Sequence, residues 1–272
     1  MDFARIIEKT AKRSAVTMND GDFIGENGLI YCGKCKEARE QVHIIPYLNN
    51  KKIRAIRLCK CEREQEEKEK QDFKRWEYEQ KVKELTRIGI TSPMYQRYTF
   101  GKDDNRQPKA TAFCRNYVDK WETMKENAAG AIFYGEVGKG KTFFAGCIAN
   151  ELIKKGVRVL FTSLKSLVNN RIKSNNGKAE QINLDRFQCF VLDDIGIENA
   201  SSTAYEIIDE IYRLNVPVII TTNLSPDELK NPDTTEKKRI YDRILQQSAT
   251  NFCLIDNNKS RLEIAQQKRK YI

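Results

Sequence analysis

The sequence contains no apolar run long enough to cross a membrane. A transmembrane helix needs about 18 to 20 largely apolar residues in succession, and no stretch of the 272 residues approaches this length. Residues 1–13 also lack the apolar block of a secretory signal peptide. We therefore expect a cytoplasmic protein with no membrane partner.

Acidic residues are fewer than basic ones. The chain has 38 Asp and Glu against 48 Lys and Arg, which gives a formal net charge of +10. This balance favours a polyanionic partner such as nucleic acid over a basic one, although a basic surface that only keeps the protein soluble accounts for the same numbers. The length and the 40% hydrophobic content predict one ordinary domain with room for a smaller module beside it.

Histidine occurs once, at His43, whereas cysteine occurs eight times. In a reducing compartment these cysteines are not expected to form a disulfide framework, so clustered ones indicate a metal site and isolated ones indicate small buried side chains. The scattered members are Cys114, Cys147, Cys189 and Cys253, of which the last three lie in apolar runs and are predicted core residues. The clustered members are Cys32, Cys35, Cys59 and Cys61.

The clustered cysteines form a C-x-x-C pair and a C-x-C pair, enough for a closed tetrahedral Zn²⁺ site. Two strand-like stretches, 42–47 and 52–58, lie between the pairs with a turn at 48–51, and a hairpin here would bring the pairs together. We prefer an all-cysteine ligand set, with His43 as the alternative fourth ligand, and metal-free cysteines as the second alternative. Bound metal would contribute on the order of 10 kcal/mol to a segment too small to fold alone.

Residues 62–88 are dominated by charge, with many acidic and basic side chains three or four apart, as an exposed helix prefers. We interpret this segment as a linker helix. Its apolar residues form one sparse stripe that is expected to pack on the adjoining domain. The stripe consists of Phe73, Trp76, Tyr78, Val82 and Leu85.

From Gly89 onward, apolar strand-like segments alternate with helical ones, which is typical of a parallel sheet with helices on its faces. Strands are predicted at 131–134, 157–162, 189–192, 216–221 and 252–255, and helices are predicted to begin near Lys141, Leu164, Ser202 and Thr234.

A glycine-rich loop follows the first of these strands and matches the P-loop pattern G-x-x-x-x-G-K-[ST]. The glycines let successive backbone N–H groups and the N-terminus of the next helix face phosphate oxygens. Lys141 is predicted to reach the β- and γ-phosphates of ATP, and the Thr142 hydroxyl to ligate Mg²⁺. The loop consists of Gly135, Glu136, Val137, Gly138, Lys139, Gly140, Lys141 and Thr142.

Two later strands also end in polar side chains, at the edge of the sheet where ligands bind. Asp193 suits a direct or outer-shell role on Mg²⁺, and Asp194 suits orienting the attacking water. Asn223 is placed to touch the γ-phosphate or that water, although Asn223 and Ser225 alone would be typical of a turn that starts a helix.

Together these segments resemble one family. The runs V-L-D-D-I-G, P-V-I-I-T-T-N-L-S-P-D-E-L and R-I-Y-D-R-I look like the AAA+ helicase loaders of the DnaC/DnaI type, phage-encoded relatives included, and the related IstB transposition ATPases. The resemblance covers residues 89–261 and implies an AAA+ fold with nucleotide bound between neighbouring subunits. It implies Asn223 as the sensor-1 residue, Arg243 as an arginine finger offered to a neighbour's ATP, and Arg261 as the sensor-2 arginine. Arg239 competes for the finger role, and without the family pattern Arg243 would be interpreted as part of a helix-surface salt bridge.

Two further segments resemble this family. Residues 88–100 are similar to the lead-in G-I-P-x-R-Y-x-x-x-T-F, with altered spacing, and the resemblance implies that they border the adenine. DnaI-type loaders also carry a zinc-bearing N-terminal module, which docks on the replicative helicase. We therefore expect a zinc-binding, helicase-docking module at 1–61, a linker helix at 62–88 and an α/β AAA+ ATPase domain at 89–272.

The function expected from this combination is ATP-dependent loading of a hexameric replicative helicase onto single-stranded DNA, in a phage or mobile-element setting, with ATP, Mg²⁺ and Zn²⁺ as cofactors and self-assembly through the ATP site. The DNA would be held by basic and aromatic side chains. The basic candidates are Lys165, Arg171, Lys173 and residues 268–270, for which solvated surface is an equally good account.

Two other functions stay open. An IstB-like ATPase that assists a transposase would share the core, but it is expected to lack the cysteine module. A nucleotide-gated adaptor with weak hydrolysis would use the module as its working part, and the intact Asp193 and Asp194 weigh against it.

Overall fold

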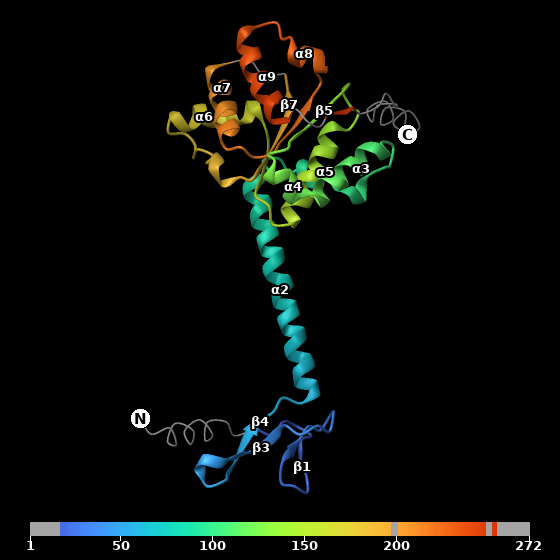
Figure 1. Ribbon diagram of the computed structural model, residues 1–272, viewed down its shortest axis with the longest axis vertical. Helices are drawn as coiled ribbons and strands as arrows, with labels where there is room; N and C mark the ends of the chain where they lie inside the picture. The colour runs from blue at the N-terminus through green and yellow to red at the C-terminus, as the bar shows by residue number, and fades with distance from the viewer. Residues whose placement is uncertain (1–16, 197–200, 249–251, 255–272) are drawn as a thin grey trace. The chain divides into compact units, whose positions relative to one another are not determined.

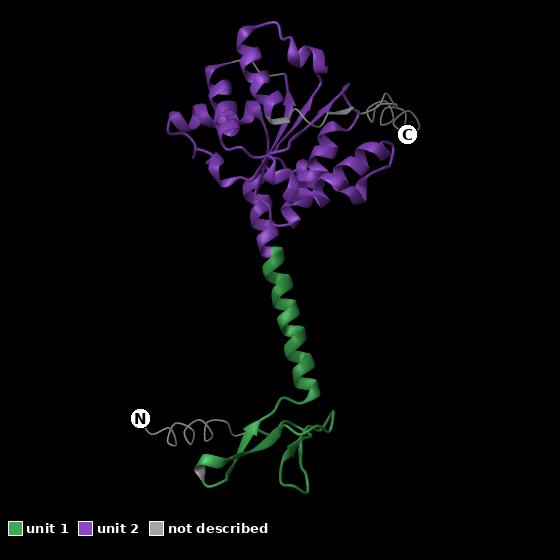
Figure 2. Ribbon diagram, in the orientation of Figure 1, with its two compact units in different colours: residues 1–79 green, residues 80–272 purple. Residues whose placement is uncertain are grey.

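The computed structural model describes residues 17–196, 201–248 and 252–254 (Figure 1). The chain forms two compact units, residues 1–79 and residues 80–272 (Figure 2). The division falls inside one continuous helix, α2 (Lys60–Gly89). The helix predicted at 62–88 is therefore slightly longer at both ends, and it begins within the second cysteine pair.

The first unit contains two small antiparallel hairpins. The hairpin predicted between the cysteine pairs is present, and Asn49 and Asn50 form its turn with φ values of 49° and 55°. The other hairpin was not predicted, because its strands are only two residues long. The strands are β1 (Phe23–Ile24), β2 (Ile30–Tyr31), β3 (Glu40–Ile45) and β4 (Lys51–Ile56), with a short 3-10 helix η1 (Pro46–Leu48) after β3. Residues 1–16 lie outside the described residues.

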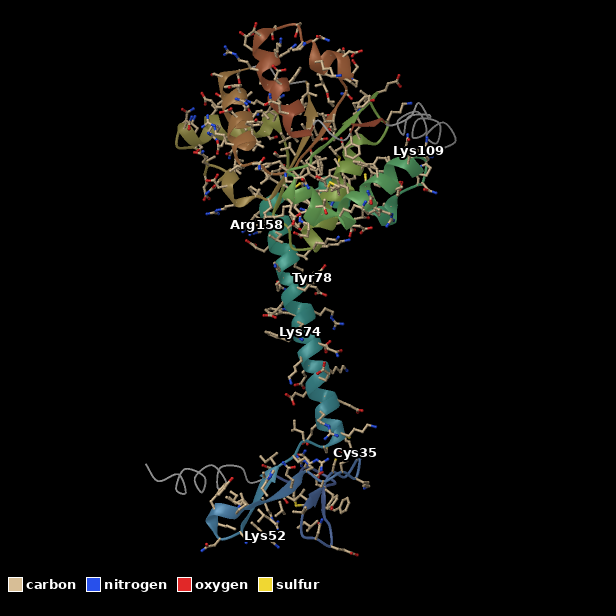
Figure 3. The ribbon with its side chains drawn as sticks, viewed as in Figure 1. Cys35, Lys52, Lys74, Tyr78, Lys109 and Arg158 are labelled. Atoms are coloured by element: carbon tan, nitrogen blue, oxygen red, sulfur yellow. The ribbon has the colours of Figure 1, made fainter. Side chains whose placement is uncertain are left out.

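The apolar stripe of α2 does not behave as one surface. Phe73, Trp76 and Tyr78 are 58%, 55% and 50% exposed (Figure 3 labels Tyr78). By contrast, Leu85 is buried and Val82 packs against the core of the second unit. Only the last turns of the helix therefore pack as predicted. None of the helices in the described parts of the chain combines the length and apolar character needed to span a bilayer.

The second unit is built on a five-stranded parallel sheet with the strand order β6-β7-β8-β5-β9. All five predicted strands are present; β5 has the predicted ends, and the ends of the others are shifted by at most three residues. Pro217 has no N–H to donate, and β8 begins just after it. The strands are β5 (Ala131–Tyr134), β6 (Val159–Ser163), β7 (Cys189–Ile195), β8 (Val218–Thr222) and β9 (Phe252–Leu254).

The four predicted helices begin at or next to their predicted residues and correspond to α5, α6, α7 and α9. Helices α3 and α4 were not predicted, whereas α8 begins directly after Ser225, which caps it as the alternative interpretation of that turn expected. The helices are α3 (Pro108–Asp119), α4 (Trp121–Glu126), α5 (Lys141–Lys154), α6 (Leu164–Asn175), α7 (Ser202–Arg213), α8 (Pro226–Lys230) and α9 (Thr235–Ser248), and the short 3-10 helices are η2 (Tyr95–Arg97), η3 (Phe100–Lys102) and η4 (Leu184–Arg186).

Strand side chains alternate between two cores, one on each face of the sheet. Phe133 and Phe161 pack in the core that includes α3, α4, α5 and the end of α2. Ile132 and Leu160 pack in the core formed with α6, α7, α8 and α9. Cys114, Cys147 and Cys189 are fully buried, whereas the side chain of Cys253 is outside the described set. The predicted α/β architecture, a parallel sheet covered by helices on both faces, is confirmed.

Candidate functional site

The P-loop lies between β5 and α5, at the carboxyl edge of the sheet. Its glycines have positive backbone φ angles, 138° at Gly135, 81° at Gly138 and 98° at Gly140. Side chains with a Cβ rarely adopt this region, so glycine allows the loop to wrap tightly. Gly140 is also the N-cap of α5, which directs the positive end of the helix toward the loop. The loop therefore forms a site for phosphate oxygens.

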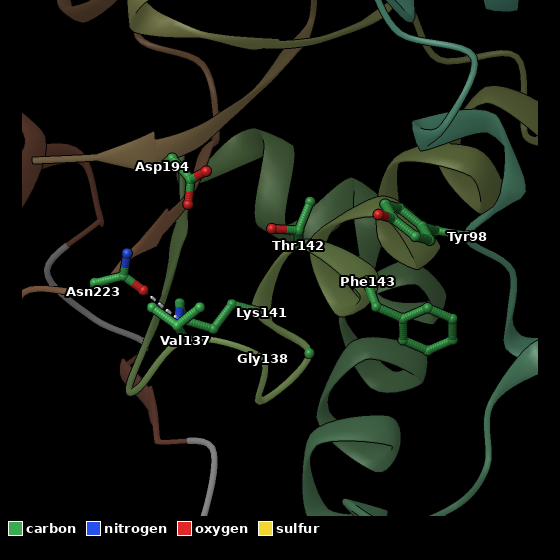
Figure 4. Close-up of a pocket in the computed structure, with 9 residues that line it drawn as sticks. Tyr98, Val137, Gly138, Lys141, Thr142, Phe143, Asp194 and Asn223 are labelled. Carbon is green, nitrogen blue, oxygen red and sulfur yellow. Dashed lines mark hydrogen bonds between the residues drawn. The ribbon is translucent and has the colours of Figure 1, made fainter. Parts of the chain in front are cut away.

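Lys141 is buried within this loop and makes three hydrogen bonds. Its Nζ donates to the carbonyl oxygens of Gly135 at 2.7 Å and Glu136 at 2.8 Å. It also donates to Oδ1 of Asn223 at 2.7 Å, the dashed line in Figure 4. Burial lowers the pKa of Lys141, while the Asp194 and Asp193 carboxylates oppose this shift. An anionic ligand bound in the loop would replace these oxygen atoms as the hydrogen-bond acceptor of the Lys141 ammonium group.

The Asp193 carboxylate is buried and accepts hydrogen bonds from three hydroxyl groups. Oδ1 accepts from Thr142 at 2.8 Å and from Thr221 at 2.6 Å, and Oδ2 accepts from Tyr95 at 3.0 Å. Because Thr142 donates its proton to Asp193, the lone pairs of its oxygen remain available to a cation. Oxygen ligands of this kind, few in number and close to phosphate, are those that Mg²⁺ prefers.

Asp194 points into the cleft because the strand is irregular at this position. The pairing of β7 with β8 shifts register between Leu192 and Ile195, and Asp194 has a φ of 55°. Its N–H donates to Thr221 Oγ1 at 2.9 Å instead of joining the ladder. Partial burial and the neighbouring Asp193 charge raise the pKa of Asp194, and Lys141 opposes this shift. Bulges that redirect a side chain are common beside functional sites.

These side chains surround a cleft of about 540 Å³, a size typical of small-molecule sites. Two aromatic residues of the cleft were not singled out by sequence analysis, although one of them lies in the lead-in that the resemblance implied would border the adenine. Tyr98 belongs to the lead-in and packs against Gly146, where a Cβ would lie 2.6 Å from the ring. Phe143 follows the P-loop and is indistinguishable in sequence from a core residue. The cleft is lined by Tyr98, Val137, Gly138, Gly140, Lys141, Thr142, Phe143, Asp194 and Asn223.

Arg243 lies on α9 and is not among the residues that line this cleft. Its Nε is 3.4 Å from Asp209 Oδ1, and its guanidinium lies 4.4 Å from the centre of the Tyr212 ring. Within its own chain Arg243 thus makes the surface salt bridge that the residues alone favoured. Arg239 is exposed on the same helix, and Arg261 lies outside the described residues.

The candidate DNA-binding residues are divided. Lys165 and Lys173 are exposed on α6, whereas Arg171 makes an ion pair with Glu210 at 2.7 Å. Residues 268–270 lie beyond the described part of the chain.

The four clustered cysteines converge, with all their Sγ atoms within 4.8 Å of one another. Tetrahedral Zn²⁺ with bonds of about 2.3 Å requires sulfur atoms about 3.8 Å apart, so this cluster could hold such an ion. Backbone N–H groups of Cys61 and Glu37 lower the pKa of the Cys35 thiol to about 6, and thiolate is the form that binds metal. His43 lies on β3 with an exposed side chain and is not part of the cluster.

A buried arginine connects the two cysteine turns. Arg39 is 8% exposed and forms ion pairs with Asp22 and with Glu62. Asp22 accepts a hydrogen bond from the N–H of Gly33 at 3.1 Å, and Glu62 accepts one from the N–H of Cys59 at 3.0 Å. Because Gly33 lies in one turn and Cys59 in the other, Arg39 links the backbones that present the sulfur atoms. Sequence analysis missed this arginine, for which charge alone gives no signal.

Comparison with known proteins assigns the chain to a sequence family. Residues 98–268 match the sequence family described as IstB-like ATP binding protein. The chain belongs to this family. IstB-like proteins are ATP-binding proteins by this description, which agrees with a cleft built on a P-loop.

Two curated relatives share this region. One is the replicative helicase loader DnaI of Bacillus subtilis (strain 168), 29% identical over 170 residues, which are 56% of this chain and 55% of the relative. Another is the replicative helicase loader DnaC of Escherichia coli (strain K12), 29% identical over 135 residues, 47% of this chain and 54% of the relative. The chain spans about half the length of the curated relatives it matches.

Among solved structures, a putative primosome component from Streptococcus pyogenes serotype M3 has the same fold. It aligns with a TM-score of 0.50 and 19% identity over 65% of this chain and 97% of that chain. The IstB-like core of this protein therefore has the predicted AAA+ P-loop fold, preceded by the cysteine-cluster module.

Proposed function

We propose that this chain is an ATP-dependent loader of a hexameric replicative DNA helicase onto single-stranded DNA during replication initiation. The observation that carries the ATP-dependent part is the meeting of Lys141, Asp194 and Asn223 in one P-loop cleft. The loader part is supported by the relatives, which are named replicative helicase loaders. The excess of basic residues is compatible with binding to single-stranded DNA.

In this proposal the cleft binds and hydrolyses ATP. The P-loop N–H groups and Lys141 hold the phosphates, Thr142 and Asp193 hold Mg²⁺, and Asp194 orients the attacking water. Mg²⁺ held by Thr142 and Asp193 would offset the negative charge of the phosphates. Asn223 already contacts the Lys141 ammonium at 2.7 Å, so it is positioned to respond to the γ-phosphate.

Arg243 is proposed to act on the ATP of a neighbouring subunit. Arg243 does not line the cleft of its own chain and instead contacts Asp209 and Tyr212. A role in hydrolysis therefore requires another copy of the chain. Mixing the Lys141→Ala and Arg243→Ala variants, each inactive alone, should restore hydrolysis, because mixed assemblies pair an intact P-loop with an intact Arg243. If the mixture stays inactive while the two variants co-assemble, the finger does not act between subunits.

The first unit is proposed to bind Zn²⁺ and to dock on the helicase, with residues 1–61 as the module, 62–88 as the linker and 89–272 as the motor. Metal analysis of the purified chain should find one zinc per chain, lowered by Cys32→Ser and unchanged by Cys114→Ser, since Cys114 is buried in the other unit. A metal-free wild-type protein would contradict the zinc assignment.

A loading assay tests the proposed function as a whole. Purified chain, a hexameric replicative helicase and a circular single-stranded DNA should yield DNA-bound helicase with ATP, and little without it. Affinity capture from host extract with mass-spectrometric identification separates this function from its main alternative. The family description favours an IstB-type helper as that alternative, and recovery of a transposase in place of a helicase would support it.

A further inference from the structure

Tyr95 belongs to the lead-in, outside the P-loop and the two polar strand ends, and it contacts the Asp193 carboxylate. The phenol oxygen donates to Asp193 Oδ2 at 3.0 Å, across 98 residues of sequence. A tyrosine phenol has a pKa of about 10, so Tyr95 carries its proton at neutral pH and acts as the donor. This contact connects the lead-in to the carboxylate at the centre of the site.

Tyr95 is itself held rigidly. Its ring stacks on Phe161 with 3.9 Å between ring centres and an angle of 13°. Its carbonyl oxygen accepts from Asn150 Nδ2 at 2.8 Å, and the same amide nitrogen lies 2.9 Å from the carbonyl oxygen of Tyr98. One buried amide therefore fixes both the residue that contacts Asp193 and the residue that lines the cleft. Such support from packing and a second hydrogen-bonded group is what positions a functional side chain.

A carboxylate offers about four acceptor positions, two on each oxygen. In Asp193, hydroxyl groups of Thr142 and Thr221 occupy two positions on Oδ1, and the Tyr95 hydroxyl occupies one on Oδ2. Counting bonds from the described residues, one acceptor position remains, on the oxygen that Tyr95 holds. Rotation of the aspartate carboxylate is intrinsically soft, so without Tyr95 only the two threonines on Oδ1 would orient it.

We propose that Tyr95 is a positioning residue that fixes the orientation of Asp193 so that its one remaining acceptor position faces the magnesium ion of the bound nucleotide. This inference rests on the proposed nucleotide function, and it assigns to the lead-in a role in metal binding. The alternative is that Tyr95 only packs, through its ring, against Phe161.

Tyr95→Phe separates the two roles, because it removes the hydroxyl and keeps the stacked ring. The matched control is Tyr117→Phe. Tyr117 is 1% exposed on α3, and its hydroxyl donates to the carbonyl of Ala129 at 2.7 Å. Both variants lose one buried tyrosine hydroxyl bond, but only one loses a bond to Asp193.

The measurement is the Mg²⁺ dependence of ATP hydrolysis and of ADP binding. Tyr95→Phe should raise the half-saturating Mg²⁺ concentration about tenfold, the effect of losing a hydrogen bond to a charged group. The KM for ATP at saturating Mg²⁺ should change less than about twofold, and Tyr117→Phe should lower the unfolding temperature without shifting the Mg²⁺ dependence. The effect of Tyr95→Phe on Mg²⁺-dependent ADP binding should also disappear in an Asp193→Asn background, since coupled residues are not additive.

A wild-type Mg²⁺ dependence in Tyr95→Phe, or an equal shift in Tyr117→Phe, would overturn the positioning role and leave the nucleotide site intact. If the wild-type chain binds no magnesium nucleotide at all, the proposed function fails, and this inference fails with it.

Discussion

Replacing Thr221 by Val tests whether the Asp193–Asp194 strand end depends on one buried hydroxyl group. Thr221 is fully buried on β8. Its oxygen donates to Asp193 Oδ1 at 2.6 Å and accepts the N–H of Asp194 at 2.9 Å. Valine keeps the shape of the side chain and removes both hydrogen bonds.

The expected loss in the free energy of unfolding follows from these two hydrogen bonds. Losing a donor to a carboxylate costs about 1.5 to 3 kcal/mol, and leaving a partly buried N–H unpaired costs about 1 kcal/mol. The two terms share one oxygen and are not strictly additive, so we expect a loss of about 2 to 4 kcal/mol. In a domain of this size the loss lowers the unfolding temperature by about 5 to 15 °C.

The matched control is Thr162→Val on β6. Thr162 is equally buried, and its hydroxyl has no hydrogen-bond partner within the described part of the structure. Removing an unpaired buried hydroxyl relieves a desolvation cost, so this variant should be as stable as the wild type or more stable. The measurement is the unfolding temperature of the wild type, Thr221→Val and Thr162→Val. Equal changes in the unfolding temperature of the two variants would refute the role of the Thr221 hydroxyl.

Three further predictions concern other parts of the molecule. Arg39→Met should speed zinc release to a chelator about tenfold, because it unlinks the two cysteine turns. Arg75→Met, which removes an exposed ion pair with Asp72 within α2, should not; equal rates would contradict the role of Arg39. Because folding raises the pKa of Asp194, its ionised form opposes folding and stability falls as pH rises through that pKa. Asp194→Asn should therefore raise the unfolding temperature at neutral pH, with the gain lost near about pH 4; a gain independent of pH would count against the shift. Gly146→Ala should favour the helix by propensity but weaken nucleotide binding about tenfold, because its Cβ would displace the Tyr98 ring. The measurement is a fluorescent-nucleotide titration, and a wild-type affinity would exclude a role of the Gly146–Tyr98 contact in nucleotide binding.

Contiguous features of the site were predictable from sequence. The P-loop is one uninterrupted segment whose glycines carry a steric requirement of their own, and its flanking strand and helix fall where the pattern requires. The contact of Lys141 with Asn223, 82 residues apart, also followed in outline, because parallel strands bring their carboxyl ends to one edge.

The resemblance implied that the lead-in would lie near the nucleotide, but the contacts of its individual side chains were not predictable. Tyr95 and Tyr98 approach the cleft only because Asn150 of α5 binds both of their carbonyl groups. An asparagine within an apolar helix was the available signal, since a buried amide needs partners. Helix α3 was missed although its buried residues, Ala110, Cys114, Tyr117 and Val118, recur at helical spacing. Helix α4 is only six residues long, too short to show a periodic pattern.

The cysteine cluster combines a feature that the sequence predicted with one that it did not. The pair spacing and the hairpin predicted which sulfur atoms would meet, and they do. The ion pairs of Arg39 with Asp22 and Glu62 depend on residues spread over 40 positions, in a sequence where charged side chains are common, so their partners could not be chosen in advance.

The most direct test of the central claim is magnesium-dependent ATP turnover by the purified chain, compared with that of Lys141→Ala. The P-loop account predicts that the wild type hydrolyses ATP, and that the variant folds with a similar unfolding temperature but neither binds nor hydrolyses it. Turnover by Lys141→Ala at the wild-type rate would contradict the assignment of this cleft as the site of ATP hydrolysis.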